Sequence, residues 1–88
     1  KLIAEAEKQA ENIIKEAKSL SKKTKDEGYR NAKKLEDEAK NPIQKIAAKA
    51  AADQLRKESD KQAQKIIATA QKKANTIVEN ARKKANEL

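Results

Sequence analysis

The stretch AQKIIATAQKKANTIVENA at residues 63–81 contains two copies of one pattern, in which alanines flank a pair of β-branched aliphatic residues. The copies begin at Ala63 and Ala74, eleven residues apart, and an earlier copy, AENIIKEA, occupies residues 10–17. Eleven residues complete three helical turns at about 3.67 residues per turn, so the small and aliphatic positions stay on one side of a helix. The pattern therefore predicts helices that pack along a seam with an eleven-residue (hendecad) repeat.

The composition limits how much of the chain can be buried. Only 36% of the 88 residues are hydrophobic and 41% are charged, with one Gly, one Pro and a single aromatic residue, Tyr29. So few large apolar side chains cannot enclose a globular core, whereas helix propensity is high along most of the chain. We expect burial to be confined to the helical seam; a disordered, solvated segment is the alternative for such a composition. The chain begins at Lys1 without methionine, and we expect it to be part of a longer protein.

Asn41-Pro42 interrupts the helical pattern. Asn is a preferred N-cap, Pro is favoured at the first helical position, and the residue before Pro is disfavoured in helical conformation. The sequence therefore predicts a first helix over about residues 2–39, a turn at 40–42 and a second helix over about 42–88. Together they form one all-α, antiparallel two-helix hairpin over residues 1–88, which could also self-associate. A continuous helix with a kink at Pro42 is the competing interpretation.

The two predicted helices have complementary side-chain sizes. If the chain folds back at Asn41-Pro42, facing positions have numbers that sum to roughly 81–84, and this rule places large residues opposite small ones, as in closely packed helices. Gly28 then makes room for Leu55, and Leu35 faces Ala47. The predicted turn is Asn41 and Pro42, and the predicted seam comprises Ala6, Ala10, Ile13, Ile14, Ala17, Gly28, Leu35, Leu55, Ala63, Ile66, Ile67, Ala70, Ala74, Ile77, Val78 and Ala81.

The same pairing rule also predicts which charged residues meet at the edge of the seam. It places Glu27 near Arg56, which would favour one register of the two helices. After the turn, the seam is expected to resume with Ile43 and Ile46.

The residue types that usually carry catalysis are scarce. The chain has no His, no Cys and no Gly-rich phosphate loop, and its three serines have no histidine to activate them. We therefore expect no enzymatic activity, no metal, no cofactor and no small-molecule substrate.

The net charge of +8 is concentrated in the second half of the chain. Residues 1–41 carry eleven basic and nine acidic residues, a difference of +2, whereas residues 42–88 carry eleven and five, a difference of +6. Many of these lysines fall opposite the predicted seam at about 100° per residue. Such a stripe could bind nucleic-acid phosphates or an anionic membrane surface, although a solvated helix face is the simpler interpretation. The lysine stripe comprises Lys57, Lys61, Lys65, Lys72, Lys73 and Lys83.

The segments AENIIKEA at 10–17 and AQKIIATA at 63–70 resemble the hendecad coiled coils of rotary ATPase peripheral stalks. The richness in Ala and Lys at eleven-residue spacing is also similar to late-embryogenesis-abundant desiccation proteins. Both resemblances concern a packing rule and carry over no functional residues.

We expect a non-catalytic structural spacer or interaction coiled coil, which pairs with a second copy of itself or with another helical protein. Electrostatic binding of nucleic acid or anionic lipid by the lysine stripe is the first alternative. A desiccation-protectant role is the second.

Overall fold

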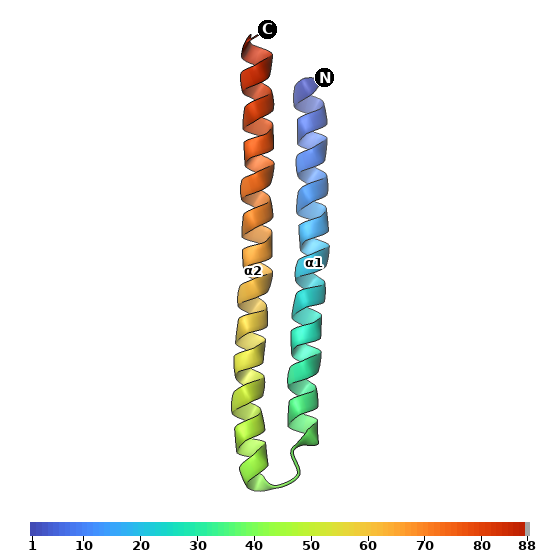
Figure 1. The fold of residues 1–88 in the computed structure, drawn as a ribbon. Coiled ribbons are helices and arrows are strands. Elements are labelled where there is room, and N and C mark those ends of the chain that lie inside the picture. The colour runs from blue at the N-terminus through green and yellow to red at the C-terminus, as the bar shows by residue number, and fades with distance from the viewer. Residues whose placement is uncertain (88) are drawn as a thin grey trace. The chain divides into compact units, whose positions relative to one another are not determined.

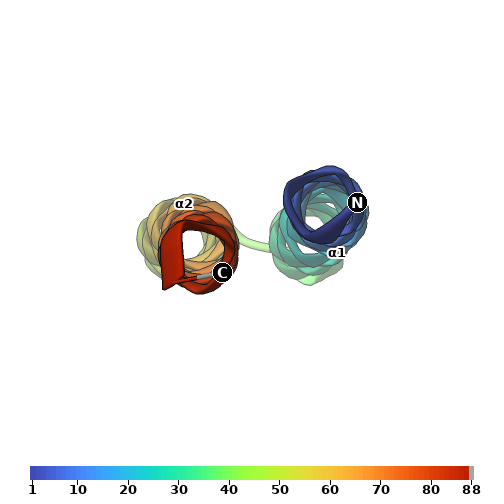
Figure 2. The same ribbon diagram turned by 90° about the horizontal axis from the view of Figure 1, so that it is seen from above.

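The computed structural model describes residues 1–87, which form two α-helices, α1 (Leu2–Glu38) and α2 (Pro42–Glu87). No strand occurs in this part of the chain. Figures 1 and 2 show a hairpin in which α2 returns beside α1 after a short connection. The predicted all-α two-helix hairpin is therefore confirmed, and the continuous kinked helix is wrong. The predicted last residue of the second helix, Leu88, lies outside the described residues.

The start of α2 is capped by Asn41. The backbone N–H of Gln44 donates a hydrogen bond to Oδ1 of Asn41 at 2.8 Å, and the N–H of Lys45 donates to the Asn41 carbonyl at 2.9 Å. The side chain of Gln44 also accepts a hydrogen bond from the backbone N–H of Lys40 at 3.0 Å. Asn41 is thus the N-cap, and Pro42 occupies the first helical position, where no N–H is required.

Every fully buried side chain in residues 1–87 is small, and none is larger than serine. Along each helix the intervals between buried positions alternate between four and seven residues. Side chains of this size allow two helix backbones to approach closely. The buried positions are Ala6, Ala10, Ala17, Ser21, Gly28 and Ala32 in α1, and Ala52, Ser59, Ala63, Ala70, Ala74 and Ala81 in α2.

The hairpin divides into two compact units. The terminal unit combines Lys1–Leu20 with α2 from Lys65 onward, and the turn unit comprises Ser21–Gln64. In the terminal unit, Ala6 and Ile77, which the pairing rule places opposite each other, line one open surface hollow.

In the turn unit the predicted partner of Gly28 is wrong by about one helical turn and that of Arg56 by nine residues, whereas Ser21 and Ala63, which share a hydrogen bond, keep the predicted sum of 84. Gly28 lies against Ser59 rather than Leu55, and Leu55 instead lines a surface hollow with Leu35. Arg56 contacts Glu36 and not the predicted Glu27.

The cause of this shift is the place where α2 begins. Figure 1 shows α2 starting beyond the end of α1, and residues 41–47 are all exposed. The first turns of α2 therefore have no part of α1 opposite them, and the centre of the fold-back lies inside α2 rather than at Asn41-Pro42. The prediction that Ile43 and Ile46 continue the seam is wrong for the same reason: they are 81% and 74% exposed.

The closest approach between the helices in the turn unit occurs at Gly28. A Cβ atom added to Gly28 would overlap both Cβ and Oγ of Ser59. The hydroxyl of Ser59 could rotate away, but its Cβ is fixed by the backbone of α2. A glycine is therefore required at position 28 by the nearness of α2, within an otherwise regular helix.

We predict that Gly28→Ala destabilises the hairpin. In an exposed helix the same change would stabilise by about 1 kcal/mol, whereas overlap with Ser59 is expected to produce a net loss of about 1–3 kcal/mol. Urea unfolding followed by circular dichroism measures the change.

Ser59 provides the matched control for this prediction. Ser59→Gly removes the overlapping Cβ. The double variant of Gly28→Ala with Ser59→Gly should therefore lose less unfolding free energy than the sum of the losses in the two single variants. Ser59→Ala keeps the Cβ, so its combination with Gly28→Ala should show no such recovery. A Gly28→Ala variant more stable than the native chain would contradict the close approach.

Candidate functional site

The two buried serines are the polar residues of the seam. Ser21 Oγ donates a hydrogen bond to the carbonyl of Ala63 in the facing helix at 3.0 Å. Ser59 Oγ donates to the carbonyl of Leu55 in its own helix at 2.8 Å. No buried side-chain nitrogen or oxygen in residues 1–87 lacks a hydrogen-bond partner. The hydroxyls therefore fit the seam without the cost of an unpaired buried polar group.

The predicted seam residues separate by size. The seven alanines and Gly28 are buried, whereas the larger aliphatic residues flank them at the edges. The sequence predicts Leu35 and Ile67 in the seam, but they are 39% and 36% exposed, so this prediction is wrong for both residues. The half-buried members of the predicted seam are Ile13, Ile14, Leu55, Ile66, Ile77 and Val78.

Sequence reasoning missed Ala52, whose side chain is fully buried. Its signal was present, since Ala52 precedes Ala63 by eleven residues. Three neighbouring alanines at 50–52 obscured which one faces α1.

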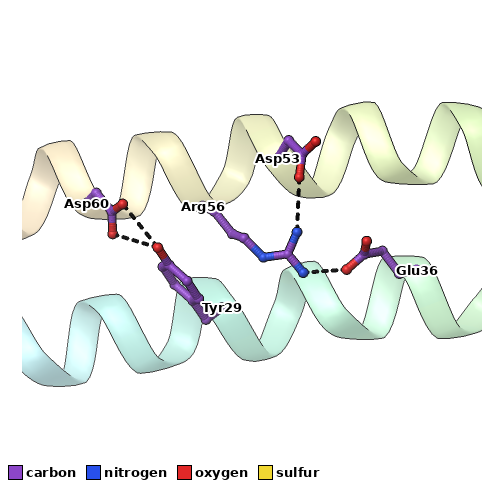
Figure 3. Close-up of polar contacts among 5 residues, drawn as sticks. All are labelled: Tyr29, Glu36, Asp53, Arg56 and Asp60. Carbon is purple, nitrogen blue, oxygen red and sulfur yellow. Dashed lines mark hydrogen bonds and ion pairs between the residues drawn. The ribbon is translucent and has the colours of Figure 1, made fainter.

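A polar cluster connects the helices beside Gly28 (Figure 3); its residues are Tyr29, Glu36, Asp53, Arg56 and Asp60. The Tyr29 hydroxyl in α1 lies 3.0 Å from both carboxylate oxygens of Asp60 in α2, to which it donates. The Arg56 guanidinium forms an ion pair with Glu36 across the helices and with Asp53 at 3.1 Å in its own helix. It also lies 6.0 Å from the centre of the Tyr29 ring, within range of a cation–π interaction.

The electrostatics of the cluster favour the protonated forms of two groups. The pKa of Tyr29 is raised above its ordinary value of 10.0, mainly because its hydroxyl donates to Asp60 and also because of partial desolvation. The pKa of Arg56 is raised mainly by its hydrogen bond to Glu36. Lys25 adds a further positive charge, with its Nζ 3.8 Å from Asp60. The cluster therefore ties α1 to α2 through alternating charges at the solvent-exposed edge of the seam.

The lysine stripe lies entirely at the surface of α2. All six lysines are exposed, and none forms an ion pair with a residue that the structure describes. In the turn unit, Lys57 and Lys61 border an open surface hollow with Gln54 and Gln64. Lys65, Lys72, Lys73 and Lys83 belong to the terminal unit.

Residues 1–87 contain no group of three or more His, Cys, Asp or Glu side chains placed to hold a metal ion. Over the same residues, neither helix includes a stretch long and apolar enough to cross a membrane. Comparison of the chain with protein-family models, with curated proteins and with solved structures gives no match. The geometry of the seam and of the exposed surfaces is therefore the basis for any functional proposal.

We predict that Tyr29 titrates above 10.0 in the folded chain and that Asp60→Ala returns its pKa toward that value. Tyr29 is the only tyrosine and the chain has no tryptophan, so the absorbance of tyrosinate reports this one group. Asp37→Ala, at an exposed acidic position of α1, is the control and should leave the titration unchanged. Equal titration of the native and Asp60→Ala chains would refute the hydrogen bond.

The raised pKa of Tyr29 also predicts a dependence of stability on pH. The folded state binds the Tyr29 proton more tightly than the unfolded state does. The contribution of this protonated hydroxyl to the stability of the fold is therefore fully present below pH 10.0 and is lost as the pH rises through the raised pKa. The unfolding midpoints of the native chain and Tyr29→Phe should therefore differ at neutral pH and converge at high pH.

Proposed function

We propose that the hairpin is a non-catalytic structural module, a hendecad-type coiled coil that serves as a spacer and offers its remaining aliphatic side chains to a further helix. That helix comes from a second copy of the chain or from another helical protein. The observation that carries this proposal is the division of side chains by size. The seam buries only small residues, while Leu2, Leu20, Leu35 and Ile67 remain between 36% and 54% exposed.

The spacing of the buried residues supports the hendecad interpretation. Intervals of four and seven residues add to eleven, so that Ala6, Ala17 and Gly28 occupy equivalent positions in α1. In α2 the same relation holds for Ala52, Ala63 and Ala74, although α2 contributes to two units. Such a repeat keeps one side of each helix directed at the seam with little supercoiling.

The energetics of burial favour a further partner helix. A buried methyl group contributes about 0.8 kcal/mol, whereas full burial of an isoleucine or leucine contributes about 1.5–3 kcal/mol. A helix that covers a flanking leucine or isoleucine would therefore add more stabilisation at that position than a seam alanine contributes. In the hairpin alone, Leu2, Leu20, Leu35 and Ile67 remain exposed to water.

We predict that the chain self-associates as its concentration rises. Sedimentation equilibrium should detect a dimer or larger species, and the unfolding midpoint should increase with concentration because association stabilises the folded state. Leu20→Gln and Ile67→Gln, at exposed aliphatic positions, should weaken association. Ala4→Gln, at another exposed position of α1, is the control. A monomer with a concentration-independent midpoint would contradict self-pairing.

The lysine stripe supports a second candidate function, electrostatic binding of nucleic acid or of an anionic membrane surface. Its six lysines are exposed and free of ion pairs with the described residues, so their charge is available to an anionic partner. Phosphate contacts of this kind are independent of base sequence and weaken as salt increases.

We predict that mixed-sequence duplex DNA binds the chain at low salt and is released at high salt. A variant with four glutamines in the stripe, at Lys61, Lys65, Lys72 and Lys73, should bind DNA more weakly. The slope of the logarithm of its binding constant against the logarithm of salt concentration should also be less steep, by about 0.9 for each phosphate that is no longer neutralised. A variant with the same charge change on α1, at Lys18, Lys22, Lys33 and Lys34, is the control; all four positions are exposed. An equal decrease in both variants would show that net charge, and not the stripe, determines binding.

A further inference from the structure

One side of the terminal unit carries aliphatic side chains from both helices. At about 98° per residue, the angle of an eleven-residue repeat, these residues lie about 50–80° from the centre of the seam. Leu2 in α1 and Ile77 in α2 line the same surface hollow, so both helices contribute to this side. Leu2 and Leu20 are 44% and 54% exposed, and the other members are half-buried. We call Leu2, Ile13, Leu20, Ile66 and Ile77 the aliphatic face.

The two edges of the aliphatic face carry opposite charges. In α1 the charged residues at the edge are Glu5 and Glu16, about 115° from the seam, and in α2 they are Lys73 and Lys84, about 80° from it. All four are exposed, and none forms an ion pair with another residue that the structure describes. Glu5 and Lys84 both line the hollow beside the aliphatic face. One side of the terminal unit therefore has an acidic edge and a basic edge.

The other charged residues of the terminal unit do not alter this division. Lys1, Lys65 and Glu87 lie about 150° from the seam at the same angle per residue, so they point away from the aliphatic face. On the opposite side of the seam, Glu7 and Lys18 occupy equivalent positions of α1. That edge of α1 has both signs of charge, and only the aliphatic face separates acids from bases.

We propose that the aliphatic face pairs with the aliphatic face of a second copy of the chain, about a twofold axis parallel to the helices. In the resulting four-helix bundle, α1 of each chain packs against α2 of the other, and neighbouring helices are antiparallel. Each helix then has its second neighbour about 90° from the seam, between its aliphatic residues and its outer edge. This arrangement rests on the self-association proposed above and identifies the surface that it uses.

The direction of the twofold axis decides which edges meet. An axis at right angles to the helices would place α1 on α1 of the second copy, so that glutamates face glutamates and lysines face lysines. An axis parallel to the helices places α1 on α2 of the second copy, so that each acidic edge faces a basic edge, twice in the dimer. Burial of the aliphatic residues supplies the attraction in either case, and the charges select the arrangement.

The heights of the charged residues along the bundle also agree with this arrangement. Ala6 lines the hollow with Ile77 and Ala81, so facing residues of the terminal unit have numbers that add to between 83 and 87. The numbers of Glu5 and Lys84 add to 89, as do those of the other glutamate and lysine. A twofold axis parallel to the helices keeps each residue at its own height, which leaves each pair about 5 Å apart along the axis. Because side chains lean toward the N-terminus of their own helix, the two members of each pair lean toward each other.

The experiment measures dimerisation of the whole chain by sedimentation equilibrium. Glu5→Lys with Glu16→Lys makes both edges basic, and Lys73→Glu with Lys84→Glu makes both edges acidic. Each double variant should dimerise about tenfold more weakly than the native chain. The chain with all four changes has exchanged edges and keeps the native net charge of +8, so it should dimerise like the native chain. Circular dichroism verifies that each variant keeps its helicity.

Two comparisons separate the aliphatic face from other surfaces. Glu11→Lys with Glu79→Lys changes the net charge as the first double variant does, at exposed residues of the terminal unit that point away from the face, and should leave dimerisation unchanged. Leu20→Gln should weaken dimerisation more than Ile67→Gln does, because Ile67 lies on the other side of the seam.

Spin labels determine the direction of the axis. The chain has no cysteine, so Lys8→Cys, Lys15→Cys and Ser19→Cys each create one site for a label, and all three positions are exposed in α1. An axis parallel to the helices keeps equal residues at equal heights, so the distance between the two labels should be nearly the same at all three positions. An axis at right angles would separate the heights of the two labels by about 3 Å more for each residue away from the axis.

The outcomes distinguish this arrangement from self-association in general. A native chain that stays monomeric at every concentration would refute both. A native dimer would refute only the arrangement if the edge variants dimerised normally, if the exchanged edges failed to restore dimerisation, or if the control variant were weakened equally. Label distances that change steadily along α1 would also refute the arrangement alone.

Discussion

Steric exclusion between two helix backbones is the constraint on which the rest of this hairpin depends. At Gly28 and Ser59 the helices approach so closely that one additional methyl group would overlap the facing helix. The same constraint explains why every buried side chain in residues 1–87 is no larger than serine. Apolar contact is thus spread over many small side chains, and the branched aliphatic residues are displaced to the edges of the seam, where water reaches them.

Close approach also determines where polar contacts can form. Because the backbones are near each other, the side chains of Tyr29 and Arg56 are long enough to cross from one helix to the other at the edge of the seam. Their partners, Asp60 and Glu36, remain partly solvated, so each contact stabilises only modestly. Their directionality nevertheless favours one relative position of the helices, which a row of similar alanines does not.

The hairpin was predictable from the sequence because its two determinants are local: the eleven-residue repeat fixes which side of each helix is buried, and Asn41-Pro42 fixes where α2 begins. The register in the turn unit was not predictable, since it depends on how far α2 starts beyond the end of α1. That error placed Leu55 opposite Gly28 and Ile43 in the seam. The pairs of Tyr29 with Asp60 and Arg56 with Glu36 depend on this register and on side-chain reach, so neither spacing nor composition could reveal them.

The connection between the helices has a consequence for how the seam is aligned. Only residues 39–41 separate α1 from α2. A seam whose small residues recur every eleven positions offers a second alignment of small residues after a displacement of eleven residues, roughly 16 Å along the axis, although the contacts of Gly28, Tyr29 and Arg56 would be lost in it. Three residues cannot supply that length without unwinding a helix. The short connection therefore excludes the displaced alignments, and after cleavage within it only the side-chain contacts between the helices would select the native alignment.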